Sequence, residues 1–189
     1  MRFTNFLLPK TSKWIFFCEG IKSEQCPHCG KLYTLKSHGS LYGIDPVKPE
    51  VARRGLRFYC SNRYSNKGCG QTLSIHFETI IPYHTVRSSH LCDFFKLLLK
   101  GYTTHRAWYS SLVPFSLRSA CSWLLKFKLN LPTLRSKLHE WAKNIQPTNQ
   151  SLEDETINML KEAFSQQDFI AAAQNKFQQS IFPVRNTSS

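Results

Sequence analysis

The sequence predicts an α+β protein in which a small β-rich part comes first and an all-α part follows. Residues 26–82 hold short apolar runs separated by glycine, asparagine and proline turns, a pattern typical of short strands. After Pro82 the apolar residues recur at helical spacing instead. The first helix face built in this way consists of Leu91, Phe94, Phe95, Leu98 and Leu99.

Composition and periodicity divide the chain into four segments. Residues 1–25 form an aromatic and basic lead-in, which we expect to contribute a strand that packs on the β-rich part. Residues 26–82 are that β-rich part, residues 83–147 a helical domain and residues 148–189 a C-terminal helical tail. The predicted strands include Lys31 to Leu35, Leu56 to Cys60 and Gln71 to Phe77, and the predicted turns include residues 37–40, 43–46 and 66–68.

Capping residues and helix breakers set the expected helix boundaries. The predicted helices are Ser88 or Ser89 to Gly101, Thr104 to about Leu112, one that begins at the cap Ser116, and one from Pro132 to about Lys143. In the third of these, the residues expected to face inward are Leu117, Cys121, Leu124 and Leu125. In the tail, the spacing from Ser151 to Asp154 fits a capping box, and the apolar residues beyond predict one long or two short helices.

The chain is strongly basic, and its charge is unevenly distributed. Lysine and arginine number 25 against 12 aspartates and glutamates, which gives a formal net charge of +13. Residues 1–147 hold 22 of the basic and 7 of the acidic side chains, whereas residues 148–189 hold 3 and 5. A charge of this size bears on solubility and partners rather than on the fold, and it favours a polyanionic partner.

Two kinds of targeting segment are not expected. No window reaches the roughly 18 to 20 uninterrupted apolar residues of a membrane span. The apolar run Phe6 to Leu8 is followed by Pro9, Lys10 and Lys13, unlike the unbroken stretch of a secretory signal. We therefore expect a soluble cytoplasmic protein, nucleoid-associated if it binds DNA, with reduced cysteines.

Seven cysteines in a reducing compartment indicate metal binding rather than disulfides. The string from Cys26 to Gly30, CPHCG, has the form of a metal knuckle, in which two thiolates grip one ion and the glycine permits a sharp turn. Cys60 and Cys69 form a second pair across a wider gap of eight residues. Gly68 and Gly70 flank Cys69, as a knuckle turn requires.

We interpret these four cysteines as the ligands of one zinc ion. Four thiolates leave no position for water or substrate, so the zinc would be structural rather than catalytic. In small zinc peptides such a site contributes an apparent ~10–16 kcal/mol at neutral pH. The alternatives are incidental free cysteines, His28 in place of one cysteine, or iron as in rubredoxin-like electron carriers, which are usually acidic. The other cysteines are Cys18, which has no assigned role, and Cys92 and Cys121, which are expected on apolar helix faces.

Basic and aromatic residues are interleaved between the two cysteine pairs. Lysine and arginine neutralise phosphates, and aromatic rings stack on bases or sugars. The alternative is a solvated β-surface with its aromatics packed inward. The basic candidates for nucleic-acid contact are Lys31, Lys36, Lys48, Arg53, Arg54, Arg57, Arg63 and Lys67, and the aromatic ones are Tyr33, Tyr42, Phe58, Tyr59 and Tyr64.

The helical domain offers a second candidate surface. Residues 103–126 align with a helix-turn-helix that places Ala107 at the helix crossing and Ser111 where a turn glycine is often found. The groove-facing side of its second helix would consist of Ser116, Arg118, Ser119, Ser122 and Lys126, with Arg118 as the best candidate for a base or phosphate contact. Otherwise these residues form only a solvated helix face.

Three strings in the β-rich part carry a family resemblance: CPHCG, then GLRFYCSNR (residues 55–63) and GCGQTLS (residues 68–74). With them, this part of the chain resembles the zinc ribbon at the N-terminus of many insertion-element transposases. A helix-turn-helix commonly comes next in those proteins, and the likeness covers about residues 26–130. It implies recognition of element-end DNA, with Cys26, Cys29, Cys60 and Cys69 as ligands. It does not imply catalysis, because the sequence has no counterpart of their ribonuclease-H-like core with three spaced carboxylates.

The sequence thus predicts a non-enzymatic, zinc-dependent DNA-binding protein, either an accessory protein of a mobile element or a remnant of a longer transposase. A second class is an RNA- or ribosome-associated protein, because similar knuckles occur in transcription and ribosomal proteins. A third is a transposase or nuclease subunit with catalysis supplied in trans. The C-terminal tail is expected to serve self-association or a partner protein.

Overall fold

A computed structural model describes residues 3–7, 14–45, 50–63, 65, 67–82, 84–113, 115–141, 151–165 and 168–182. The chain forms two compact units, and the boundary between them falls at Glu78 and Thr79. The first unit holds a sheet and one helix and the second is helical, so the predicted α+β class is confirmed. No helix in the described ranges is long and apolar enough to cross a membrane.

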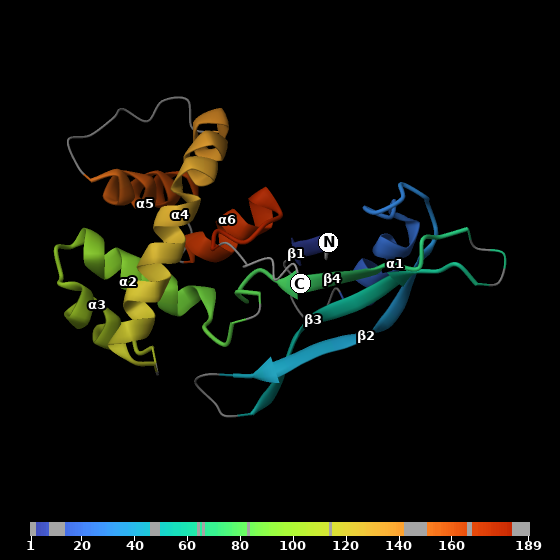
Figure 1. The fold of residues 1–189 in the computed structure, drawn as a ribbon, viewed down its shortest axis with the longest axis horizontal. Coiled ribbons are helices and arrows are strands. Elements are labelled where there is room, and N and C mark those ends of the chain that lie inside the picture. The colour runs from blue at the N-terminus through green and yellow to red at the C-terminus, as the bar shows by residue number, and fades with distance from the viewer. Residues whose placement is uncertain are drawn as a thin grey trace. The chain divides into compact units, whose positions relative to one another are not determined.

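The sheet of the first unit has the strand order β1-β4-β3-β2 (Figure 1). β1 (Phe3–Leu7) pairs in parallel with β4 (Thr72–Phe77). β3 (Val51–Cys60) pairs antiparallel with β4 and with the edge strand β2 (Leu35–Ile44). The helix α1 (Trp14–Ser23) lies against β2. The lead-in therefore contributes both a strand and a helix to this unit.

The side chains described in the first unit form one apolar core cluster. Alternate residues of β3 and β4 point to it, because side chains alternate between the two faces of a strand. Its buried members are Ile21, Cys26, Leu35, Leu56, Phe58, Cys60, Leu73 and Ile75, and Cys18 and Cys29 pack against them. Two of the predicted metal ligands are thus core residues themselves.

The predicted strand from Lys31 to Leu35 and the predicted turn at residues 37–40 are both wrong. β2 begins at Leu35 and continues through the supposed turn to Ile44. A register shift leaves His38 as an extra residue, and Gly39 adopts φ = +114°, which glycine tolerates. Glycine and serine predicted a turn here. Because β2 pairs with β3 along its whole length, these residues form a β-bulge within the strand instead.

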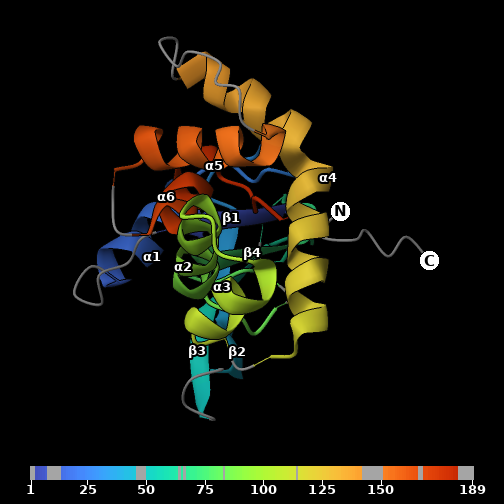
Figure 2. The same cartoon turned by 90° about the vertical axis from the view of Figure 1, so that its left-hand side faces the viewer.

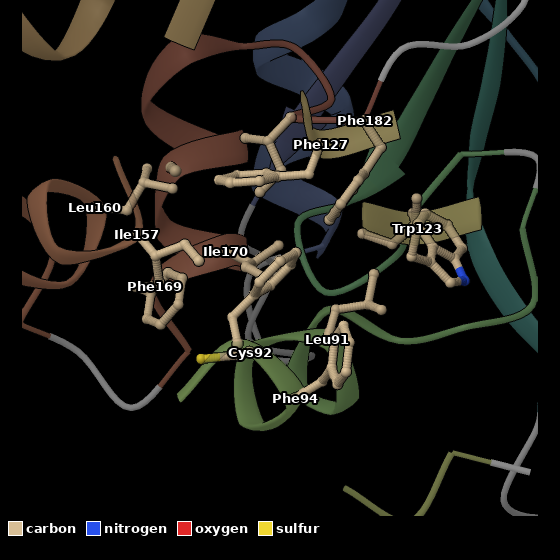
Figure 3. Packing of buried hydrophobic residues seen from close by; sticks show 14 of the residues in the cluster. Leu91, Cys92, Phe94, Trp123, Phe127, Ile157, Leu160, Phe169, Ile170 and Phe182 are labelled. Carbon is tan, nitrogen blue, oxygen red and sulfur yellow. The ribbon is translucent and has the colours of Figure 1, made fainter. Parts of the chain in front are cut away.

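The second unit contains α2 (Ser88–Leu99), α3 (Thr104–Ser110), α4 (Leu117–Trp141), α5 (Leu152–Ala163) and α6 (Phe169–Phe177). α4 contacts α3 and α5, and α2 contacts α3, α5 and α6 (Figure 2). Figure 3 shows that α2, α4, α5 and α6 share one apolar cluster. The two helices of the tail therefore bury their apolar faces within this unit.

Polar contacts join helices that are distant in sequence. The Ser88 hydroxyl at the start of α2 donates to Asp168 Oδ2 at 2.6 Å, and Asp168 Oδ1 accepts the Ala171 N–H at 3.0 Å at the start of α6. Arg135 of α4 donates to Glu155 of α5 at 2.9 Å. Ser151 caps α5 as predicted, because its hydroxyl accepts the Asp154 N–H at 3.2 Å. The same hydroxyl donates to Asp154 Oδ2 at 2.7 Å, and this side-chain contact accompanies the N-cap half of the predicted capping box.

The predicted helix break at Pro132 is wrong, because α4 is one helix of 25 residues with this proline inside it. Proline cannot donate to the carbonyl four residues earlier. Pro132 and Lys128 are both exposed, so water can solvate that carbonyl. Leu131 and Leu134 are buried on either side of the proline, and their packing carries the helix through.

The buried face of α4 also differs from the prediction. Cys121 is exposed and Leu125 is 58% exposed, although both were expected to face inward. The core side of the helix consists instead of Ala120, Trp123, Phe127, Leu131, Leu134 and Leu138. Apolar residues occur on more than one side of α4. The face predicted from periodicity therefore overlaps the buried face only in part.

In the turn between α3 and α4, the residue with the left-handed backbone conformation is Leu112, one position after Ser111, where the turn glycine was expected. Ser111 has φ = −82°, and its hydroxyl donates to the Trp108 carbonyl at 2.8 Å. Leu112 instead adopts the left-handed conformation, with φ = +55°, while its side chain is 81% exposed. A leucine here makes little apolar contact and occupies a conformation that favours glycine.

Replacing Leu112 by glycine is expected to raise the free energy of unfolding of the helical unit by about 0.5–1 kcal/mol, because it removes the left-handed penalty of a Cβ atom. Urea unfolding followed by far-ultraviolet circular dichroism measures the change. The matched control is Leu129→Gly in regular α4, where the leucine is 67% exposed and glycine is expected to destabilise by about 1 kcal/mol. Destabilisation of similar size at both positions would contradict the assigned turn.

Candidate metal centre and nucleic-acid surface

The four cysteines predicted as ligands come together in the first unit. Their sulfur atoms all lie within 4.8 Å of one another. Cys26 Sγ is 3.8 Å from Cys69 Sγ, and Cys29 Sγ is 3.7 Å from Cys60 Sγ. A tetrahedron with metal–sulfur bonds of about 2.3 Å has edges of about 3.8 Å. The cluster can therefore hold one tetrahedral metal ion.

Two backbone turns with matching hydrogen bonds present these sulfurs. The Cys26 carbonyl accepts the Gly30 N–H at 2.7 Å, and the Cys60 carbonyl accepts the Gly70 N–H at 2.9 Å. In each turn the N–H of the first cysteine donates to the carbonyl of the residue after the glycine, at 2.9 and 2.8 Å. Gly30 and Gly70 have φ values of +70° and +73°. The second pair thus forms the same turn as the first, although eight residues separate its cysteines.

The extra residues of the second pair form a loop that is closed at its base. The Ser61 N–H donates to the Thr34 carbonyl at 2.7 Å, and the Gly68 N–H donates to the Ser61 carbonyl at 2.9 Å. Lys31 Nζ donates to the Lys67 carbonyl, which ties this loop to the first turn. A Cβ atom at Gly68 would overlap the Ser61 carbonyl and lie 2.6 Å from Cys60 Sγ. The loop can close beside the sulfurs only with glycine at position 68.

Hydrogen bonds and burial make the four sulfurs unequal. The Cys69 N–H donates to Cys60 Sγ at 3.2 Å, and Thr34 Oγ1 lies 3.1 Å from the same sulfur. Burial raises the pKa of Cys60, but these two contacts and the neighbouring thiols lower it to about 7. Burial raises the pKa of Cys26 to about 12. Four thiolates this close together repel one another, so a bound cation is what would allow all of them to ionise.

This donor set has a limited chemistry. Four cysteine sulfurs fill a tetrahedral coordination sphere and leave no position for water or substrate. Soft thiolate ligands suit zinc and iron rather than magnesium or calcium. A metal ion here would hold two segments of chain together and would not activate a reactant.

The basic residues predicted to contact nucleic acid occupy three places in the first unit. The segments that carry the cysteines hold Lys31, Arg63 and Lys67. The paired strands carry Lys36 and Arg57. The part of β3 that pairs with β2 beyond the end of β4 carries Arg53 and Arg54. Of these, Arg54 is engaged by its own sheet, because its side chain crosses Gly43 and donates to the Ile44 carbonyl at 3.4 Å. The remaining six are exposed.

The aromatic candidates divide between core and surface. Phe58 is fully buried, so its predicted role in nucleic-acid contact is wrong; it belongs to the core because its position in β3 faces that side. Tyr33 and Tyr42 are each 65% exposed. Lys48 and Tyr64 lie outside the described residues.

The helical candidates project from the first turns of α4 and from the residue before it. Ser116, Arg118 and Ser122 are exposed, and Ser119 is half-buried. Lys126 Nζ lies 3.0 Å from His84 Nε2 and 4.7 Å from the ring centroid of Trp123, so this cation packs on its own unit. Ala107 of α3 and Ala120 of α4 are fully buried.

Sequence reasoning missed two features of these surfaces. Thr34 contacts a ligand sulfur, but no spacing or motif marks a threonine for that role. His38 was predicted to be a turn residue, whereas its ring lies edge-on to Tyr59 with centroids 5.5 Å apart. Only the pairing of β2 with β3 brings these two rings together.

We expect the purified protein to hold about one metal ion per chain, and Cys29→Ser or Cys69→Ser to release it and unfold the first unit, because the metal would link the two turns that carry the ligands. Elemental analysis and thermal unfolding measure both effects. Cys121→Ser, at an exposed cysteine of α4, is the matched control and should change neither. A ligand variant that keeps its metal and its stability would exclude the four-sulfur site.

Gly68→Ala should have the same effect as loss of a ligand, because the added methyl group cannot fit between the Ser61 carbonyl and Cys60 Sγ. The control is Gly20→Ala in α1, where a Cβ atom meets nothing within 4 Å and helix propensity predicts a gain of about 0.5–1 kcal/mol. Metal content per chain, measured for both variants, tests the packing. Full metal content in Gly68→Ala would show that the loop closes differently.

Comparison with protein-family models, with curated proteins and with solved structures finds no match for this chain.

Proposed function

We propose that this protein is a non-enzymatic DNA-binding protein whose first unit is a zinc ribbon, stabilised by one structural Zn²⁺ on Cys26, Cys29, Cys60 and Cys69. The observation that carries the proposal is the cluster of four sulfurs within 4.8 Å of one another, in segments that also bear exposed basic residues. A site without an open coordination position supports a structural role for the metal.

Zinc is the metal that this site favours. It binds four thiolates tetrahedrally and has no redox chemistry, so it stays bound in a reducing compartment. Iron in the same ligand set serves electron transfer, and such carriers are usually acidic. The net charge of +13 on this chain argues against that role.

Nucleic acid is the partner that the charge favours. Lys31, Arg63 and Lys67 are exposed in the segments that bear the cysteines, and phosphate neutralisation by such residues supplies most of non-specific DNA affinity. A metal that fixes the two turns would also fix the positions of these cations. The proposed role of the zinc is therefore to shape a phosphate-binding surface.

We propose that α3 and α4 form the sequence-reading helix-turn-helix. Three observations support this: Ala107 and Ala120 are fully buried, Leu112 takes a left-handed turn conformation, and Arg118 and Ser122 are exposed at the start of α4. Because Lys126 packs on Trp123, Arg118 is the stronger candidate for a base contact. Self-association through residues 148–189 remains a prediction and would have to use faces that α5 and α6 leave exposed.

The narrower proposal, that the DNA is the end of a mobile element, is supported by the motif resemblance alone. It makes the protein an accessory DNA-binding protein or a transposase remnant. Duplexes that carry terminal inverted repeats and scrambled duplexes of the same composition would distinguish element-end recognition from general binding. Structured RNA as competitor tests the rival assignment, since RNA that displaces the duplex at equal concentration would favour an RNA-binding role.

Arg118→Ala should mainly reduce discrimination between a duplex selected from a random library and a scrambled one, by about 1–3 kcal/mol, because a base contact is lost. Arg53→Ala with Arg57→Ala should weaken binding to both duplexes and lower the salt slope by about one per phosphate contact. Fluorescence anisotropy over a salt series measures both effects. Lys161→Ala on the exposed surface of α5 is the control. Equal loss on both duplexes in the Arg118 variant would refute the recognition-helix assignment.

A further inference from the structure

The sheet of the first unit has two different faces. Residues directly opposite one another in antiparallel strands point to the same side. Lys36, Tyr59 and Thr72 form one such row across β2, β3 and β4, and Gly39, Arg57 and Ser74 form another. The rows between and beside them hold core residues such as Leu35, Leu56 and Phe58. We call the side that carries Lys36, Gly39, Arg57, Tyr59, Thr72 and Ser74 the open face.

The open face is accessible and carries positive charge. Lys36, Arg57 and Thr72 are exposed, and Tyr59 is half-buried. The six residues of the open face include no carboxylate. Within the described part of the chain, the side chains of Lys36 and Arg57 make no hydrogen bond or ion pair. His76 lies on the next row, where burial, and then the charge of Arg54, lower its pKa to about 4. The charge of this surface at neutral pH therefore comes from its lysine and arginine.

Tyr59 is the centre of the open face. Its direct neighbours across the strands are Lys36 on one side and the small Thr72 on the other. The edge-on contact with His38 holds one side of the ring. Glycine, threonine and serine around it leave a low surface, over which a flat ring can approach the tyrosine. Cross-strand packing within the sheet explains the contact between His38 and Tyr59. It does not explain why the Tyr59 ring lies near the two exposed cations Lys36 and Arg57.

We propose that the open face binds single-stranded DNA, with one base stacked on Tyr59 and the flanking phosphates on Lys36 and Arg57. Aromatic rings beside cations on an exposed sheet bind unpaired bases because every base offers a stacking face. A closed duplex does not offer its base faces, so this surface is suited to unpaired strands. The inference rests on the proposed DNA binding, but it assigns a different form of DNA and a different surface from α4.

The test uses the full, metal-loaded chain and labelled oligodeoxythymidine, with a fully paired duplex in parallel. Tyr59→Ala should weaken binding to the single strand by roughly 5- to 100-fold and leave duplex binding within about twofold, because stacking is lost. Tyr59→Phe keeps the stacking ring and should bind within about twofold of the unmodified protein. The matched control is Tyr109→Ala, at a tyrosine of α3 that is 55% exposed, which should bind normally.

Metal content and thermal unfolding of each variant separate loss of stacking from loss of fold. Lys36→Gln and Arg57→Gln give an independent test, because each should lower the salt dependence of single-strand binding by roughly one phosphate contact. The inference is overturned if folded Tyr59→Ala binds the single strand normally, or if Tyr59→Phe loses as much affinity as Tyr59→Ala. Binding of duplex without single strand overturns this inference and leaves the proposed function intact. Binding of single strand without duplex supports this inference and overturns the duplex-reading role proposed for α3 and α4. Binding of neither overturns both this inference and the proposed DNA binding.

Discussion

The packing of the first unit brings four cysteine sulfurs from two segments of the chain within 4.8 Å of one another. Among the residues whose side chains are described, eight apolar or cysteine side chains form its buried cluster, and two of them are candidate ligands. A thiolate–zinc site contributes an apparent ~10–16 kcal/mol in small peptides, as much as the whole net stability of a typical domain, ~5–15 kcal/mol. If the proposed zinc is bound, its coordination would keep the two turns, the closed loop between Cys60 and Cys69, and the basic residues around them in place.

The second unit is stabilised in a different way. Aromatic side chains from α2, α4 and the segment after α6 pack closely, with ring centroids 4.8 Å apart for Phe95 and Phe127 and for Trp123 and Phe182. Partly buried polar contacts at Asp168 and Arg135 join helices that are distant in sequence. This unit has an apolar core of its own. The proposal thus combines a unit organised around a candidate metal site with a helical unit organised around an apolar cluster, each with its own candidate DNA surface.

The sequence was informative wherever local chemistry decides the outcome. The cysteine pairs were recognisable because each turn needs a glycine just after its second cysteine, and Gly30 and Gly70 are in place. Long-range packing decided the rest. Residues 37–40 join β2 because β3 pairs along their length, and Pro132 stays helical because buried leucines flank it. Nor could spacing reveal that Lys126 packs on Trp123, since that contact depends on the orientation of α4.

The central claim is that four thiolates, and nothing else, hold one zinc ion in the native chain. X-ray absorption at the zinc edge on freshly purified protein tests this most directly, because it identifies the metal and its neighbours together. The account predicts a single shell of four sulfurs at about 2.3 Å. A shell that contains nitrogen or oxygen, iron in place of zinc, or no bound metal would contradict it.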